Sequence, residues 1–181
     1  MRIDKKDSLA LVIDFQEKLI PAIDKNEILL QNTEILMKGL DILEVPLIIT
    51  QQYTKGLGMT VESLQNVFGN SFQYFDKTTF SCYDDEIILE NIKNYGKKNI
   101  IICGIEAHIC VQQTVIDCMA AGYQVIVVED CISSRKENDK KLAMHRMTQE
   151  GAIAATYESI LFELTRDSRS EKFKEISKLI K

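Results

Sequence analysis

The sequence predicts an α/β fold: a doubly wound (Rossmann-like), mostly parallel sheet of about six strands with helices on both faces. Two observations predict it. Short, almost wholly apolar runs alternate along the chain with segments whose apolar residues recur at helical spacing. Strands that are apolar on both faces are typical of parallel sheets covered by helices on both sides, and right-handed crossovers wind such a chain into two helical layers.

Six short segments rich in branched apolar residues are predicted to be strands, at residues 8–15, 46–50, 73–77, 100–103, 124–129 and 152–155, with 73–77 the weakest pattern. Helices are predicted at residues 25–43, 60 or 61–68, 84–95, about 107–121, 139–150, 157–164 and 171–181. Asp24 and Thr156 are suitable N-caps for the first and sixth helices, and Gly96 is a stop signal after the third. Residues 51–59 are predicted to be a turn-rich loop.

Length and composition favour one globular domain over residues 1–181, with enough chain to bury a sizeable core. Of the residues, 45% are hydrophobic and 27% are charged. The net charge of −5 argues against non-specific nucleic-acid binding, which needs a basic surface. No signal-peptide layout and no apolar run long enough for a bilayer is visible, so we expect a cytoplasmic protein without a membrane partner.

The five cysteines are an odd number and do not fall in CxxC pairs, which favours reduced thiols over a disulfide framework. One of them, Cys110, follows an apolar strand and a turn at Gly104 and stands near the start of a helix. Unpaired amides and the positive end of the helix dipole favour a thiolate there, and thiolate is the nucleophile. We therefore predict that Cys110 is a catalytic nucleophile, although a small buried hydrophobe is the alternative interpretation.

Asp14 and Lys77 are the other two candidates, because each lies at the end of a predicted strand, as Cys110 lies just beyond one. In a doubly wound sheet, ligands bind beyond the carboxyl ends of the strands. Asp14 is the candidate base for the thiol proton, and Lys77 is a cation that can favour thiolate and carboxylate. If the strand order is 3-2-1-4-5, Lys77 must reach across the top of the sheet.

In these residues the chain resembles the isochorismatase-like cysteine hydrolases. The motifs are IDFQ with Asp14 and Gln16, DKTTFS with Lys77, and GIEAHICVQQT with Cys110. They occur in the family's order over essentially the whole chain. The segment TQQYTKGLG, residues 50–58, is similar to one in the isochorismatase-domain-containing group.

The resemblance implies an Asp–Lys–Cys triad that hydrolyses a C–N bond of a small amide-type substrate through a thioester-type intermediate. It also implies a homo-oligomer, a dimer or larger. A cis peptide between Ile105 and Glu106 is expected, with the amides of Ile109 and Cys110 directed at the oxyanion.

The sequence also departs from relatives within that family. Nicotinamidases carry a metal-binding Asp-x-His after the second strand, where this chain has Gln51, Gln52 and Tyr53, so we expect no metal and no other cofactor. Candidate pocket residues are Phe15, Gln16, Gln51, Tyr53 and Phe80.

Two other classes of function remain to be weighed. A catalytically silent module that acts through oligomer or partner contacts is the main alternative to a hydrolase. A dinucleotide-binding domain is disfavoured, because DFQEKL replaces the GxGxxG fingerprint after the first strand.

Overall fold

The computed structural model describes residues 2–181 and contains a six-stranded parallel sheet in the order β3-β2-β1-β4-β5-β6. The strands are β1 (Ser8–Ile13), β2 (Leu47–Gln52), β3 (Phe75–Lys77), β4 (Asn99–Gly104), β5 (Gln124–Ile132) and β6 (Ile153–Ala155). The order reverses between β1 and β4, so the predicted doubly wound α/β fold is confirmed.

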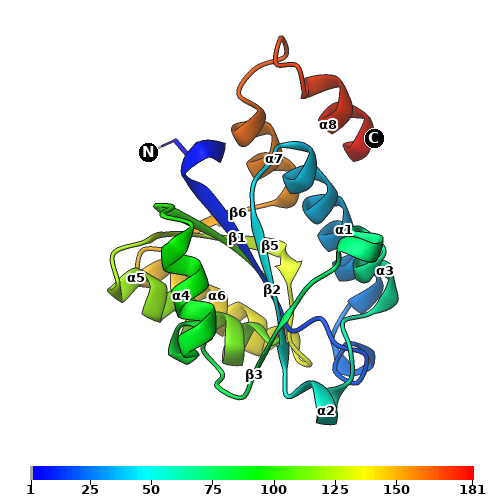
Figure 1. The fold of residues 1–181 in the computed structure, drawn as a ribbon. Coiled ribbons are helices and arrows are strands. Elements are labelled where there is room, and N and C mark those ends of the chain that lie inside the picture. The colour runs from blue at the N-terminus through cyan, green and yellow to red at the C-terminus, as the bar shows by residue number, and fades with distance from the viewer. Residues whose placement is uncertain (1) are drawn as a thin grey trace.

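Helices cover both faces of this sheet (Figure 1). They are α1 (Asn26–Ile42), α2 (Thr54–Leu57), α3 (Glu62–Gln65), α4 (Glu86–Asn94), α5 (Gln112–Ala120), α6 (Glu137–Gln149), α7 (Tyr157–Thr165) and α8 (Phe173–Ile180). In Figure 1, α1, α7 and α8 form one layer, and α4, α5 and α6 form the other. No helix within residues 2–181 has both the length and the apolar composition needed to cross a membrane.

Every residue of β1 is buried, because the strand packs against both layers. Leu9, Leu11 and Ile13 belong to the core cluster beneath α4, α5 and α6, whereas Ala10 and Val12 belong to the cluster beneath α1 and α7. This alternation follows from the strand period of two, and it explains why the sequence pattern of β1 is apolar throughout.

Two local predictions were wrong. Asp24 does not cap the first helix: Lys25, in the left-handed region, occupies the N-cap, and the backbone of Asp24 is hydrogen-bonded to Ser133 and Ser134 instead. The helix predicted up to residue 68 is shorter, because the amides of Val67 and Phe68 turn back to carbonyls three residues earlier and the chain leaves the α-helix at α3.

Candidate active site

Lys77 ends β3, and its side chain passes the end of β2 to reach Asp14, the residue after β1. The distance between Lys77 Nζ and Asp14 Oδ2 is 2.8 Å, and neither side chain is accessible to solvent. The strand order therefore brings together two residues 63 positions apart in the sequence.

The ammonium of Lys77 has further acceptors on the same side of the sheet. They are Gln52 Oε1 at 2.7 Å and the carbonyl oxygens of Thr79 at 3.2 Å and Phe80 at 3.3 Å. Burial is the largest single effect and by itself would lower the Lys77 pKa. The charge of Asp14, its hydrogen bond, and the nearby thiols of Cys82 and Cys110 together outweigh burial, so the pKa is raised overall. An ammonium has three hydrogens, so Lys77 is a fixed, fully engaged cation.

Asp14 is held in a defined orientation by its neighbours. It adopts a left-handed conformation, with φ of 58°, and its amide donates to the carbonyl of Thr50 at 3.1 Å. The hydroxyl of Thr50 donates to Asp14 Oδ1 at 2.8 Å, while Lys77 donates to Oδ2. Each carboxylate oxygen thus has one donor and retains a lone pair for another group.

Cys110 lies in a π-helical turn, Ala107–Val111, that leads directly into α5. Its exposed fraction is 6%, whereas the other four cysteines are 0–1% exposed. Burial raises the pKa of this thiol strongly, the adjacent charge of Asp14 raises it further, and Lys77 offsets only part of the shift. The predicted preference for thiolate at the helix start was therefore wrong, because burial and Asp14 determine the protonation state.

The peptide between Ile105 and Glu106 is cis. The amide of Ile105 donates to the carbonyl of Ile13 at 3.0 Å, and the carbonyl of Glu106 accepts from Ile109 at 3.1 Å and Val111 at 3.3 Å. The amide of Ile109 is thus already engaged, which contradicts its expected place as an oxyanion donor.

The carboxylate of Glu106 pairs with a cation. It accepts from Arg135 Nε at 3.0 Å and from the Arg135 amide at 3.2 Å. Both residues line a cleft of about 340 Å³ together with Lys18, Leu19, Ala22 and Ile23.

Three of the five predicted pocket residues do not line an open pocket. Phe15 is 1% exposed and packs in the core cluster on the α1 side, whereas Cys110 borders the opposite cluster. Gln16 is fully buried, with its amide hydrogen-bonded to the backbone of Gln52 and Gly58. Gln51 is also fully buried, between the hydroxyls of Thr54 and Thr60.

The other two, Tyr53 and Phe80, are 52% and 54% exposed. Both are joined to the lysine, since the amide of Tyr53 donates to the Lys77 carbonyl and the carbonyl of Phe80 accepts from the Lys77 ammonium. The backbone groups of Tyr53 and Phe80 thus lie beside Lys77, while their side chains are largely exposed.

Sequence reasoning missed four residues that contact this group, namely Thr50, Gln52, Cys82 and Thr114. Thr50 and Gln52 give a signal in the sequence, because Thr50 is the polar last residue of the apolar run PLIIT and Gln52 follows it two positions later. Cys82 is fully buried, and Lys77 is among the charges that act on its pKa, which burial raises to about 11. Thr114 has no sequence signal, since a threonine in an amphipathic helix is ordinary.

The sequence matches a known protein family over most of its length. A family model described as "Isochorismatase domain" matches residues 8–159. Isochorismatase family protein 1B of Dictyostelium discoideum is 38% identical over 184 residues, covering 99% of this chain and 89% of that protein.

Among solved structures, the MAR1 ribonuclease from Caenorhabditis elegans is 38% identical with a TM-score of 0.93, covering 99% of this chain and 92% of that one. The YcaC gene product of Escherichia coli, described as an octameric hydrolase of unknown specificity, is 27% identical with a TM-score of 0.90. That match covers 99% of this chain and 89% of the YcaC chain.

Proposed function

The chain belongs to the isochorismatase family, and from that premise we propose that it is a cysteine hydrolase cleaving a C–N bond of a small amide-type substrate. Membership in this family supports hydrolase activity in general. The observation that carries the finer proposal is the placement of the least buried thiol, Cys110, beside a carboxylate, Asp14, which is fixed by Lys77.

The proposed reaction begins with the thiol protonated. As Cys110 Sγ attacks the carbonyl carbon of the substrate, Asp14 accepts the thiol proton and the carbonyl oxygen becomes an oxyanion. The amide of Cys110 itself remains the candidate oxyanion donor. The C–N bond then breaks, the leaving nitrogen takes the proton from Asp14, and ammonia or an amine departs from a thioester.

Water completes the cycle. Asp14 accepts a proton from the attacking water, the C–S bond of the thioester breaks, and the carboxylic acid product leaves while the thiol regains its proton. Lys77 acts by charge, because its hydrogens are engaged with Asp14, Gln52 and the carbonyls of Thr79 and Phe80. Its positive charge lowers the cost of forming thiolate next to a carboxylate.

The limited exposure of Cys110 restricts the substrate class. A thiol with a 6% exposed fraction can meet a small molecule but not a folded polypeptide. We propose that Tyr53 and Phe80, whose side chains are largely exposed, line the approach.

The test is ammonia release from a panel of small primary amides, combined with mass spectrometry of the peptide that contains Cys110. We expect one or more amides to give both ammonia and an acyl adduct on Cys110. Cys110→Ser and Asp14→Asn should abolish both signals. Cys118→Ala, which removes a fully buried thiol further along α5, is the matched control and should retain them.

The main competing function is a silent module that acts through contacts alone. This alternative is favoured by the thiol of Cys110, because it is almost completely buried and its pKa is raised. It would be supported if no amide gives ammonia above the Cys110→Ser background and no adduct forms.

Ribonuclease activity is a further candidate, favoured by 38% identity to the C. elegans protein of that name and disfavoured by the net charge of −5. Cleavage of single-stranded RNA by wild type but not by Cys110→Ser would establish it.

We also propose that the chain forms a homo-oligomer, because the YcaC product, similar over 99% of this chain, is described as octameric. Light scattering coupled to size-exclusion chromatography tests this directly. A mass equal to one 20.7 kDa chain at micromolar concentration would contradict it.

A further inference from the structure

We propose that Thr114 is a positioning residue that couples the nucleophile to the segment holding Lys77. The inference rests on the proposed function, because it assigns to Thr114 the task of holding Cys110 at a fixed distance from the charge of Lys77. Thr114 belongs to α5, while Lys77 is at the end of β3, so the two parts of the site are carried by different elements.

The Thr114 hydroxyl makes two hydrogen bonds, one to each part. It donates to the carbonyl of Cys110 at 2.7 Å and accepts from the amide of Cys82 at 2.9 Å. Thr114 is fully buried, so water does not compete for either bond. A hydroxyl carries one hydrogen, and here Thr114 donates it to the backbone carbonyl of Cys110.

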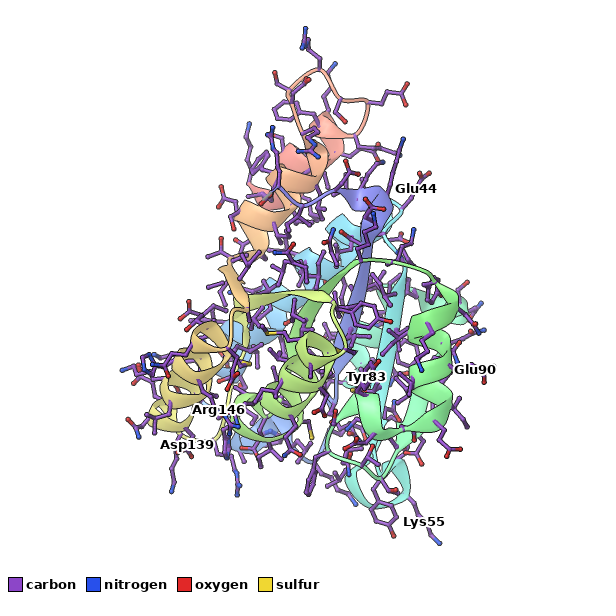
Figure 2. All side chains as sticks on the ribbon, turned by 90° about the vertical axis from the view of Figure 1, so that its left-hand side faces the viewer. Glu44, Lys55, Tyr83, Glu90, Asp139 and Arg146 are labelled. Atoms are coloured by element: carbon purple, nitrogen blue, oxygen red, sulfur yellow. The ribbon has the colours of Figure 1, made fainter. Side chains whose placement is uncertain are left out.

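Cys82 belongs to the segment of residues 79–82, which holds the lysine. The carbonyls of Thr79 and Phe80 accept from the Lys77 ammonium, and the Thr79 hydroxyl donates to the carbonyl of Ser81 at 2.8 Å. The next residue, Tyr83, lies between α4 and α5 (Figure 2). A continuous set of hydrogen bonds and peptide links therefore runs from Cys110 through Thr114 to Lys77.

This coupling has a chemical consequence because the Lys77 charge lowers the pKa of Cys110, against burial and Asp14, which raise it. Coulombic interaction depends on distance, so displacement of residues 79–82 weakens that effect. Loss of the Thr114 hydroxyl should then make thiolate harder to form at Cys110. A packing defect elsewhere in the core would not do this.

The experiment measures the rate of Cys110 alkylation by acrylamide against pH, by peptide mass spectrometry, so that no substrate needs to be known. Thr114→Val removes the hydroxyl and keeps the shape, and Thr114→Ser keeps the hydroxyl. Thr165→Val is the matched control, because Thr165 is buried and its hydroxyl donates to the carbonyl of Leu161 four residues earlier, at 2.7 Å, in α7 on the other face of the sheet.

We expect Thr114→Val to react about threefold more slowly or worse near neutral pH, with its profile displaced to higher pH, because less thiolate forms. Thr114→Ser should retain the wild-type profile, and Thr165→Val should leave it unchanged whatever stability it loses. If Thr114→Val does not fold, Thr114→Ala makes the same comparison with less crowding at the β-carbon.

A wild-type profile in the hydroxyl-free variants would overturn the inference and leave Thr114 a structural residue only. Lys77→Met separates this result from failure of the proposed function. If Lys77→Met displaces the profile and Thr114→Val does not, only the positioning inference falls. If Lys77→Met also leaves the profile unchanged, the triad itself is contradicted.

Discussion

Lys77 and Asp14 form a fully buried ion pair across β2, with 2.8 Å between Nζ and Oδ2 and no solvent exposure of either side chain. Charges removed from water are tolerated only when they are paired and hydrogen-bonded, and here both conditions hold. The pair is therefore a structural element of the sheet as well as the charged part of the proposed site.

Breaking this pair from one side should destabilise the protein strongly. Lys77→Met leaves the Asp14 carboxylate buried without its cation, and we expect a loss of roughly 3–5 kcal/mol in the free energy of unfolding. The double variant Asp14→Asn/Lys77→Met should lose less than the sum of the two single variants, because no uncompensated charge remains. Urea denaturation measures all three. Arg169→Ala, which breaks an exposed pair with Asp167, is the control and should change little. Additive losses would contradict the buried pair.

Stability should fall as the pH rises above the ordinary thiol pKa of 9.0. Burial raises the pKa of Cys82 to about 11 and that of Cys103 to about 12, so between 9.0 and those values the unfolded chain loses protons that the folded chain keeps. Each such thiol then lowers the unfolding free energy by about 1.4 kcal/mol per pH unit. The raised pKa of Lys77 acts in the same direction, since that contribution is lost as pH rises through its folded value.

Cys103→Ala isolates one of these contributions. Unfolding free energies measured by urea at about pH 8 and about pH 10 should fall less steeply in this variant than in wild type, because one ionisation is removed. Equal slopes in the two proteins would show that Cys103 does not titrate differently in the folded and unfolded states.

Replacement of Gln16 by leucine should loosen the segment around α2. The Gln16 amide donates to the carbonyls of Gln52 and Gly58 and accepts from the Gln52 amide, all in a fully buried position. Leucine satisfies none of them. Three backbone groups of the half-buried residues Gln52 and Gly58 then lose a partner, at about 1 kcal/mol each, so we expect a loss of roughly 2–4 kcal/mol.

Trypsin cleavage after Lys55 reports this change locally. Lys55 is exposed and extends from α2 away from the sheet (Figure 2). Cleavage there should be faster in Gln16→Leu than in wild type. Gln149→Leu, at an exposed position at the end of α6, is the control, and equal cleavage in both variants would refute the anchoring of α2 by Gln16.

Gly104 should not accept a side chain. Its φ is +149°, and a β-carbon there would lie 2.5 Å from Cβ and 2.6 Å from the carbonyl oxygen of Ile13. We expect Gly104→Ala to lose roughly 2–4 kcal/mol, from steric conflict with a backbone that cannot move aside. Gly122→Ala, at φ of +90° with no atom within 4 Å, should lose only about 1 kcal/mol, from backbone strain. Similar thermal denaturation of the two variants would contradict this close approach of β4 to β1.

The sheet could be predicted because its strands are apolar on both faces. The buried pair could be predicted because Asp14 directly follows β1 and Lys77 ends β3. The face of the sheet on which Phe15 packs could not be predicted. Asp14 adopts a left-handed conformation that interrupts the strand alternation, so Phe15 turns into the α1 side of the core.

The burial of Gln16 and Gln51 could not be predicted from the sequence either. Their hydrogen-bond partners are backbone and hydroxyl groups of the following loop, such as those of Gly58 and Thr60. The protonation of Cys110 depends on the balance of burial, Asp14 and Lys77, which have opposing effects. The relative size of these three effects on the pKa depends on distances and burial in the folded protein, which the sequence does not give.

The order of the strands has a consequence for the nascent chain. β1, β2 and β3 are synthesised first and are neighbours in the sheet, so the partners Asp14 and Lys77 are both available before β4 leaves the ribosome. Cys110 follows β4, which pairs with β1 on the side opposite β2, so its thiol is synthesised later. Translation therefore delivers Asp14 and Lys77, the proposed base and its cation, ahead of Cys110, the proposed nucleophile.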